Sequence, residues 1–382
     1  MSGGRSEERS DEPHTARPEN MSGGRSEERS DEPHTAQPQS TTPSLEGLDL
    51  GRLGEYLSVE KPDLLSGELT GEHVAGGKSN LTYVVSDGST SVVVRRPPMG
   101  HVLATAHDMN REYRVMTALA PTAVPVPQTY LMCTDESVIG APFYVMEYAT
   151  GTPFRRADEL APYGPERAQA ISARLVDILV DLHAVDPAEV GLSDFGRPEG
   201  FLSRQVRRWT KQLEASTSRE LPGAQELAAD LAESVPADGD VSIIHGDYRL
   251  DNVLVDVDHD DEFTAVLDWE MATLGDPLSD VALFAVYQRL PEIGSGYAVS
   301  DVSLAPGYLP APQLLDRYAD RSGRDTSRLS WHLGLAYFKL AAILEGIHYR
   351  YIHGQTVGEG FAEVGNATIP LIAAGRAALE ED

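Results

Sequence analysis

The sequence predicts an α+β protein in which a small antiparallel-sheet lobe precedes a mainly helical lobe. Short β-branched and aromatic runs, separated by turn residues, gather between residues 60 and 150. After Gly151 the apolar residues recur at helical spacing instead. Strands and helices do not alternate as they would in a βαβ chain. We therefore expect a tail at 1–44, an N-terminal lobe at 45–150 and a C-terminal lobe at 151–382.

The tail contains a duplication. Residues 1–16 recur unchanged at 21–36, and the segment consists mainly of Ser, Glu, Arg, Gly and Pro. Such a segment buries too little apolar surface to offset the entropy lost on ordering. Two copies are also too few units for a stacked repeat protein. We predict that 1–44 is disordered.

The elements of the first lobe follow from turn residues and side-chain periodicity. Asp87-Gly88 marks a hairpin turn, and Pro97-Pro98 ends the strand after it. The expected elements are a helix at 45–57, a strand, glycine turn and strand at 73–85, a turn at 86–89, a strand at 91–95, a helix at 107–119 and a strand at 143–146.

The second lobe begins with an amphipathic helix that has Pro165 in its first turn, a favoured position for proline. Three short apolar runs interrupt the helices, and the last two predict an inserted hairpin. The expected helices are 165–183, 201–215, 226–233 and 331–351, and the expected strands are 241–244, 253–255 and 264–267.

The composition excludes several classes of protein. Asp and Glu number 60 against 31 Lys and Arg, which disfavours binding to nucleic acid or to an anionic membrane surface. Cys133 is the single cysteine, so a disulfide framework or a multi-cysteine zinc site is excluded. No apolar run approaches the roughly 20 residues of a membrane helix, and the N-terminus is polar without a signal-peptide core. We expect a cytoplasmic protein.

Lysine occurs at only four positions, Lys61, Lys78, Lys211 and Lys339, while arginine is plentiful. An acidic excess with little lysine suits a protein of a halophilic source, where concentrated salt screens self-repulsion. An acidic pocket for a cationic substrate is the alternative, which requires local clustering that total charge does not show.

The strongest chemical signal is the segment HGDYRLDN at 245–252, which lies between two predicted strands. Asp247 and Asn252 are five residues apart, the spacing of the catalytic Asp and the metal-binding Asn in kinase loops. Asp268 follows a further strand, in the segment LDWE. Phosphoryl transfer needs a carboxylate to orient the attacking hydroxyl and oxygen ligands for Mg²⁺. Asp247 fits the first role, and Asn252 and Asp268 fit the second; otherwise these residues cap turns and His245 simply packs.

Together with the segment LDWEMATLGDPLSDVA at 267–282, these motifs resemble the aminoglycoside phosphotransferase and choline kinase group. The resemblance covers about 71–351 and implies a two-lobed protein-kinase-like fold with ATP and Mg²⁺ as cofactors. It places Asp268 where the DFG aspartate stands. Asp280 then corresponds to a buried carboxylate that braces the catalytic loop, or else is an ordinary helix cap. Asp276, before Pro277, is more readily explained as a turn residue.

The resemblance also locates a nucleotide site. Gly76, Gly77, Ser79 and Asn80 resemble the hairpin that covers the nucleotide, where backbone N–H groups bind phosphate oxygens. Glu147 and Tyr148 resemble the hinge between the lobes, whose backbone would bind adenine, although a strand end followed by a turn explains them too.

The usual kinase lysine is missing from the next strand, which reads VVVRRPP at 92–98. Arg95 is the best positional match and Arg96 the reserve, since arginine also pairs with phosphate and stays charged. Glu112 on the following helix is the expected partner of this cation. Alternatively, Glu112 is an exposed carboxylate paired with a neighbouring arginine of its own helix.

Three further segments narrow the resemblance to the kinase domain fused to some acyl-CoA dehydrogenases: RRPP at 95–98, RQVRRW at 204–209 and FKLAAILEGI at 338–347. The acceptor that this subgroup implies is a hydroxylated acyl-CoA. The predicted helix 201–215 carries a basic face that suits CoA phosphates, unless it is simply solvated. Its cations are Arg204, Arg207, Arg208 and Lys211.

The sequence thus predicts an ATP- and Mg²⁺-dependent kinase for a small-molecule hydroxyl, with the nucleotide bound by the first lobe. The alternative is a kinase whose phosphoryl acceptor is an aminoglycoside or an amino alcohol. A metal-dependent hydrolase and a pseudokinase that only binds ligands are rivals of another class. The missing lysine keeps the pseudokinase alternative open, whereas the complete set of Asp247, Asn252 and Asp268 argues against it. The oligomeric state and the choice of ATP over GTP stay open.

Overall fold

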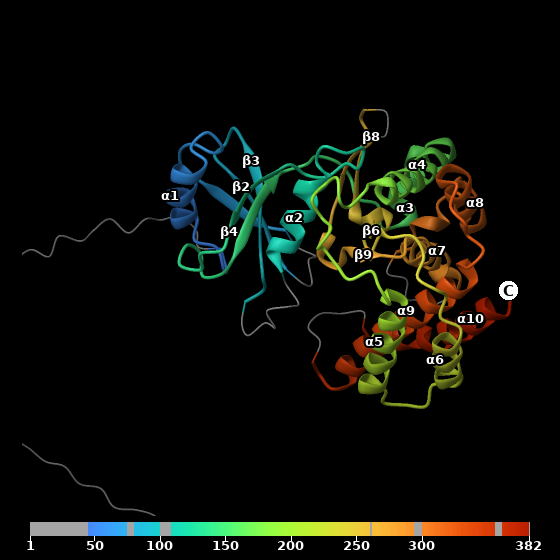
Figure 1. Ribbon diagram of the computed structural model, residues 1–382. Helices are drawn as coiled ribbons and strands as arrows, with labels where there is room; N and C mark the ends of the chain where they lie inside the picture. The colour runs from blue at the N-terminus through green and yellow to red at the C-terminus, as the bar shows by residue number, and fades with distance from the viewer. Residues whose placement is uncertain are drawn as a thin grey trace, which may run out of the picture. The chain divides into compact units, whose positions relative to one another are not determined.

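The computed structural model describes residues 45–74, 80–99, 108–259, 262–293, 300–355 and 361–381. Its first lobe is a five-stranded antiparallel sheet in the order β1-β2-β3-β5-β4 (Figure 1). The strands are β1 Thr70–His73, β2 Leu81–Ser86, β3 Ser91–Arg96, β4 Thr129–Cys133 and β5 Phe143–Glu147. Strands β2, β3 and β5 match expected strands, β1 begins three residues before the expected start at 73, and β4 was not expected.

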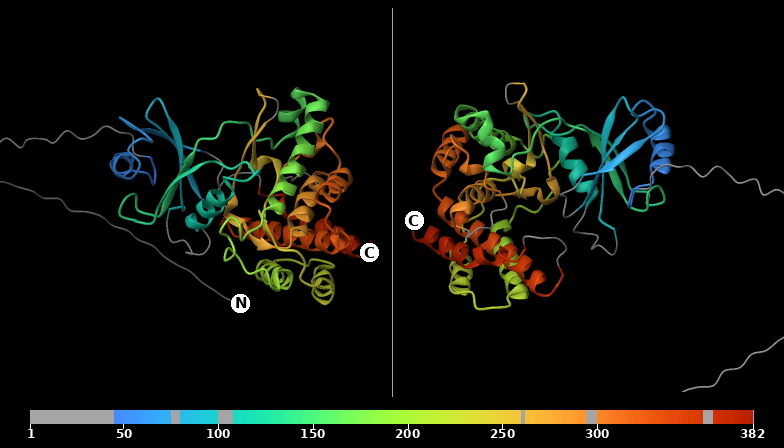
Figure 2. Two further views of the ribbon diagram at one scale, coloured as in Figure 1. Left: turned by 45° about the horizontal axis from the view of Figure 1, so that its top comes forward. Right: turned by 180° about the vertical axis from the view of Figure 1, so that it is seen from behind.

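One helix covers each face of this sheet. Helix α1, Leu50–Glu60, packs on one face, and helix α2, Met109–Leu119, packs on the other, as both views of Figure 2 show. Val92 and Val94 of β3 contribute to the core under α1, whereas Val93 points to the α2 side. Successive strand residues alternate between faces, so β3 is buried on both. This alternation also sends Arg95 and Arg96 in opposite directions.

Helix α1 begins five residues later than expected. Asp49 accepts a hydrogen bond from the backbone N–H of Arg52, which caps the helix before Leu50. Leu45 and Leu48, which the apolar pattern assigned to the helix, form an isolated β-bridge instead. The expected helix is therefore present, but its cap decides where it starts.

The second lobe is mainly helical (Figure 1). The long helix α9, Leu329–Ile352, is buried along most of its length and packs against α5, α7 and α10. The described helices of this lobe, besides short 3₁₀ turns, are α3 Ala157–Leu160, α4 Pro165–Ala184, α5 Phe201–Ser216, α6 Ala224–Glu233, α7 Leu278–Ile293, α8 Ala311–Ser322, α9 and α10 Thr368–Glu380.

Two small antiparallel ribbons sit within the helices. Strand β6, Ser242–Ile244, pairs with β9, Thr273–Gly275, and β7, Val253–Asp256, pairs with β8, Glu262–Val266. The second pair is the expected inserted hairpin, whereas β9 was not foreseen. The ribbons matter because the loops that connect them, 245–252 and 267–272, carry the predicted chemistry.

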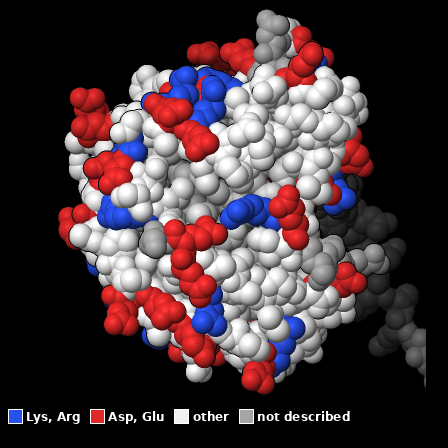
Figure 3. Space-filling model, turned by 90° about the vertical axis from the view of Figure 1, so that its right-hand side faces the viewer, with Lys and Arg blue, Asp and Glu red and all other residues white. Residues whose placement is uncertain are grey.

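None of the helices in the described part of the chain has the length and hydrophobicity of a membrane span. Acidic side chains are scattered over the face shown in Figure 3, interspersed with arginine and lysine and with wide uncharged areas. The acidic excess of the composition is therefore spread over this face and not gathered in one patch.

Candidate active site

Asp247 lies in the loop between β6 and the 3₁₀ turn at Leu250–Asn252, and three side chains hold its carboxylate. Asn252 donates from Nδ2 to the Asp247 backbone carbonyl at 2.9 Å and to Oδ2 at 3.2 Å. Tyr287 of α7 donates to Oδ1 at 2.7 Å, and the Arg249 Nε lies 3.4 Å from Oδ2. The carboxylate is thus fixed in orientation by groups from two elements.

Asp280, at the start of α7, holds this loop in place. Its carboxylate accepts from the backbone N–H of His245 at 2.6 Å and from that of Gly246 at 2.8 Å. Its side chain is 1% exposed and lies 3.5 Å from His183 Nε2. Burial raises the pKa of Asp280, but the bonds from His183 and the loop outweigh it and lower the pKa overall. Asp280 is therefore the brace of the loop and not merely a helix cap.

Gly246 is required for this geometry. Its φ is +85°, and a Cβ placed there would lie 2.8 Å from the Met271 carbonyl oxygen. His245 is buried, and its Nδ1 accepts from the Asp247 N–H at 3.2 Å. The Nε2 proton is then the one that reaches the Leu267 carbonyl at 2.9 Å. His245 thereby ties the Asp247 loop to the residue before Asp268.

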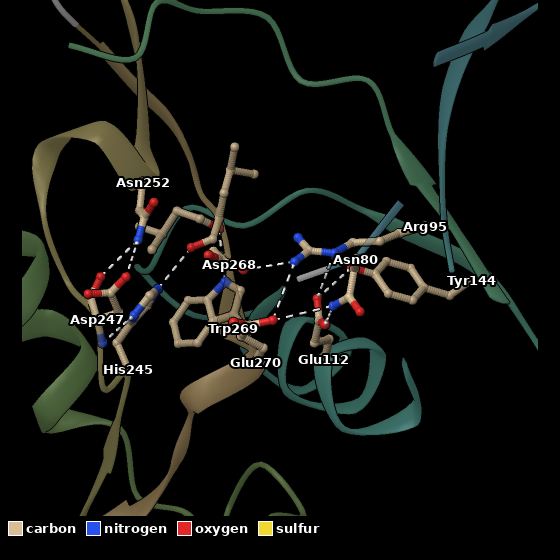
Figure 4. Close-up of polar contacts among 12 residues, drawn as sticks. Asn80, Arg95, Glu112, Tyr144, His245, Asp247, Asn252, Asp268, Trp269 and Glu270 are labelled. Atoms are coloured by element: carbon tan, nitrogen blue, oxygen red, sulfur yellow. Dashed lines mark hydrogen bonds and ion pairs between the residues drawn. The ribbon is translucent and has the colours of Figure 1, made fainter. Parts of the chain in front are cut away.

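Asp268 stands at the end of β8 in a left-handed backbone conformation, with φ +65°. It is the non-glycine residue with positive φ in the described ranges, a conformation that costs of order 1 kcal/mol or more and persists where the surroundings impose it. The N–H of Leu267 donates to the Asn252 carbonyl at 2.8 Å, so Asp268 lies beside the Asp247 loop (Figure 4). The structure therefore brings Asp247, Asn252 and Asp268 together from two loops.

Arg95 of β3 reaches into this cluster from the sheet lobe. Its Nη2 lies 2.8 Å from Asp268 Oδ1, and its Nε lies 3.3 Å from Glu112 Oε2 (Figure 4). Arg96 points the other way and donates to the backbone carbonyls of Gly47 and Ile139, the latter at 3.0 Å. Of the two arginines left open by the sequence, Arg95 is the one that faces the site.

Glu112 is buried at the base of α2, with its side chain 1% exposed. Tyr144 donates to its Oε2 at 2.9 Å and Asn80 donates to its Oε1 at 3.0 Å. Burial raises the pKa of Glu112 to about 7, although Arg95 and the Tyr144 bond lower it in part. The local alternative paired Glu112 with Arg111 or Arg114. Arg111 donates instead to backbone carbonyls of the second lobe, and Arg114 pairs with Asp194.

Only some of the other residues predicted to bind the nucleotide lie in the described part of the chain. Gly76, Gly77 and Ser79 lie outside the described residues. Asn80 is buried, and its amide faces Glu112 and Glu270. Glu147 ends β5, with its N–H donated to the Gln128 carbonyl at 2.8 Å, and Tyr148 beside it is 47% exposed. These two do not join the polar cluster of Figure 4.

Sequence reasoning missed three residues of the site region. Glu270, two positions after Asp268, contacts Asn80 at 3.4 Å. Tyr287 and Lys339 lie in the apolar helices α7 and α9, where the hydrophobic pattern gave no hint of a polar role. Lys339 donates from Nζ to the Gly246 carbonyl at 3.0 Å. Tyr287 and Lys339 are recognised as site residues only because their helices face the catalytic loop.

The oxygen donors present fit a hard cation such as Mg²⁺. Asn252 turns its amide nitrogen to Asp247, which leaves the amide oxygen directed away from that carboxylate (Figure 4). Asp268 uses one carboxylate oxygen for Arg95. Mg²⁺ is usually held by one or two carboxylates together with phosphate oxygens. In the described ranges no group of three or more His, Cys, Asp or Glu side chains could hold a metal without such help.

One cavity opens next to the catalytic loop, and a larger groove adjoins that cavity. A cavity of about 650 Å³ is bounded by Gly246, by α5 and α9, and by residues 270–273. A larger groove of about 1410 Å³ runs between α5 and α6 and shares Arg204, Gln205 and Arg208 with the first. Arg207 and Lys211 line the groove only. The predicted basic face of 201–215 thus borders both spaces.

Comparison with known proteins agrees with this geometry. Residues 70–332 match the model of the family described as "Phosphotransferase enzyme family". The chain belongs to this phosphotransferase family. It is 36% identical over 339 residues to acyl-CoA dehydrogenase family member 11 of Rattus norvegicus, covering 86% of this chain and 43% of the relative. The human protein of the same name is 36% identical over 313 residues, with 80% and 40% covered. The chain therefore spans about two fifths of these relatives.

Solved structures show the same fold. A protein of Ralstonia eutropha described as an aminoglycoside phosphotransferase is 32% identical, with a TM-score of 0.76 over 87% of this chain and 98% of that one. A GDP and kanamycin complex of the aminoglycoside phosphotransferase APH(2")-IIIa type gives a TM-score of 0.58 at 17% identity, with 85% and 98% covered. The predicted family, the two-lobed kinase-like fold and the class of small-molecule phosphotransferase are confirmed.

Proposed function

We propose that this phosphotransferase moves the γ-phosphoryl group of ATP to a hydroxyl of a small molecule with the help of Mg²⁺. The observation that carries the proposal is the Asp247 carboxylate, oriented by Asn252 and Tyr287 beside the Arg95–Asp268 pair. One carboxylate can receive the acceptor's proton while a second, with an amide oxygen, is placed for a cation.

We assign to Asp247 the role of orienting the acceptor hydroxyl and receiving its proton. The Asp247 side chain is 24% exposed, and a carboxylate oxygen can accept a second hydrogen bond beside the one that Oδ1 takes from Tyr287 at 2.7 Å. An acceptor hydroxyl that donates to the same carboxylate would be oriented for attack and would lose its proton to Asp247 as the new O–P bond forms.

Asn252 and Asp268 would hold Mg²⁺, and the cation would supply positive charge against the negative charge that develops during transfer. Arg95 replaces the usual lysine. Its guanidinium is held between Glu112 and Asp268, so it is positioned at the carboxylate that would carry the metal. An arginine fork has donors in excess of these two partners and can add a phosphate.

Arg95→Met should weaken ADP–Mg²⁺ binding about tenfold or more, because a charge-assisted bond to phosphate is lost and Asp268 loses its partner. The ADP–Mg²⁺ affinity of Arg95→Lys should lie between those of the wild type and Arg95→Met, because one ammonium cannot span Glu112 and Asp268 as the guanidinium fork does. Calorimetric titration with ADP and Mg²⁺ measures both.

Arg96→Met is the matched control for this test. Arg96 is the next residue of β3, but it donates to backbone carbonyls on the far side of the sheet. Its loss should lower stability and leave ADP affinity within about threefold. If Arg96→Met weakened nucleotide binding and Arg95→Met did not, the assignment of the phosphate site would be wrong.

For the acceptor we propose a hydroxyacyl-CoA. The named relatives are acyl-CoA dehydrogenases, and this chain aligns with about two fifths of their length. The groove between α5 and α6 carries Arg207 and Lys211, cations that suit the phosphates of CoA. A cationic aminoglycoside would meet like charge on this side of the catalytic loop.

The deciding experiment is a phosphate-transfer assay with purified protein, ATP and Mg²⁺ across hydroxyacyl-CoAs, sugars, amino alcohols and aminoglycosides. Mass spectrometry of the acceptor identifies the product. Phosphorylated hydroxyacyl-CoA supports the full proposal, and a different phosphorylated acceptor overturns only the substrate. Phosphate release from ATP without any acceptor would indicate a hydrolase, and nucleotide binding without turnover would indicate a pseudokinase.

A further inference from the structure

The cavity of about 650 Å³ beside the catalytic loop has an unusual charge balance for so acidic a chain. Five cations line it, and they are Arg111, Arg197, Arg204, Arg208 and Lys339. In the part of the chain that the structure describes, none of the five has a carboxylate within 4.0 Å. Arg111 and Arg204 donate to backbone carbonyls, which do not neutralise their charge. Acidic residues outnumber basic ones 60 to 31, so five cations without a carboxylate partner at one cavity call for an explanation.

The acidic residues that line the same cavity are engaged elsewhere. Asp108 caps α2 by accepting from the Arg111 N–H at 3.1 Å. Asp280 is bonded to the two backbone N–H groups of the catalytic loop. Glu270 is turned to Asn80 and Arg95, at 3.4 and 4.0 Å. The charge left to face the cavity is therefore positive.

Lys339 is the cation nearest the chemistry. Its Nζ donates to the Gly246 carbonyl at 3.0 Å, directly before Asp247, and lies 5.5 Å from the centre of the Trp209 ring. Arg208 lies over the same ring at 5.0 Å. An ammonium has three donors, and Gly246 takes one. Helices α5 and α9, which carry these residues, pack side by side (Figures 1 and 2).

Burial lowers the pKa of Lys339 and the nearby Arg208 lowers it further, while Asp247 and Asp280 raise it. Nearby negative charge therefore balances the positive charge of the Lys339 ammonium only in part. A ligand that brought one negative group into the cavity would relieve this and would use the free donors.

We infer that Lys339 and Arg208, arranged around Trp209, form an anion subsite of the acceptor cavity. Its ligand is a carboxylate or phosphate group of a hydroxyl compound, held close to the catalytic loop while the hydroxyl reaches Asp247. The inference rests on the proposed function, because it takes this cavity as the acceptor site. The subsite would thus make a short hydroxy acid or hydroxyalkyl phosphate the acceptor in place of the hydroxyacyl-CoA proposed above, whose acyl hydroxyl lies far from its phosphates.

Two pairs of probes test the subsite by calorimetry, without nucleotide. 3-Hydroxybutyrate is compared with its methyl ester, and glycerol 3-phosphate with glycerol, which separates the carboxylate from the phosphate. The anionic member of at least one pair should bind roughly tenfold tighter or more to the wild-type chain. Lys339→Met and Arg208→Gln should reduce that preference to within about threefold, and Lys339→Arg should retain most of it.

Arg350→Gln is the matched control, because it removes the same charge from α9 but is exposed at the end of that helix and lines neither cavity. It should leave the preference intact. Equal affinity for charged and neutral probes, or an unchanged preference in Lys339→Met, would overturn the inference, and so would an equal loss in Arg350→Gln. ADP binding and the melting temperature show whether each variant is folded. Since no transfer is measured, loss of the anion preference and failure of phosphotransfer are separate results.

Discussion

Asp247→Ala should lower kcat for phosphotransfer by about 100- to 10,000-fold, the usual contribution of a positioned acid–base group. The acceptor hydroxyl would lose both its orienting partner and the group that takes its proton. Nucleotide affinity should stay within about threefold of wild type, because Arg95 and Asp268 are held by each other and by Glu112 and not by Asp247. Steady-state kinetics and calorimetry with ADP measure the two effects separately.

A carboxylate on the nearby β7–β8 hairpin provides the control. Asp258 is exposed in the turn after β7, and Asp258→Ala removes the same charge without touching the loop. It should keep the wild-type kcat. Wild-type turnover in Asp247→Ala would refute the catalytic assignment. Parallel loss of ADP binding would show instead that the variant has lost the structure of the loop.

The two acidic loop motifs were predictable because short-range spacing fixes their geometry. Asp247 and Asn252 are joined by one 3₁₀ turn, so five residues suffice to bring the amide to the carboxylate. Asp268 follows a strand paired with the one that leaves Asn252, so a hairpin places it next to the same loop. In each case local structure alone determines which side chains meet.

The residues that stayed ambiguous depend on contacts between distant elements. Arg95 and Arg96 are chemically alike, and only the side of β3 that faces the second lobe separates them. Tyr287 and Lys339 lie in helices whose residues are mostly apolar and buried. The hydrophobic pattern of such helices does not indicate which polar residue faces the site. Strand β9 was missed because it has three residues and pairs with β6, which is remote in sequence. Strand β4 pairs with the nearby β5, but four of its five residues are half-buried, so it has no clear alternation of buried and exposed positions.

Asp280→Ala should destabilise the protein by about 3–5 kcal/mol, the largest stability effect that we expect from the site. The substitution leaves the N–H groups of His245 and Gly246 without acceptors in a buried place. It also removes the carboxylate that faces His183 at 3.5 Å. Urea unfolding at pH 7 measures the loss, and kcat should fall with it because the Asp247 loop is no longer braced.

Ser279→Ala and the dependence on pH test the physical reason for this effect. Ser279 adjoins Asp280, and its buried hydroxyl has no hydrogen-bond partner among the described residues, so its removal should change stability by less than about 1 kcal/mol. The pKa of Asp280 is lowered in the folded state, so its stabilisation is complete above the unfolded value near 4 and is lost as pH falls below it. The difference between wild type and Asp280→Ala should therefore be full at pH 7 and should shrink on acidification below about pH 4. A difference that stayed constant down to pH 2 would show that packing, and not the carboxylate's charge, holds the loop.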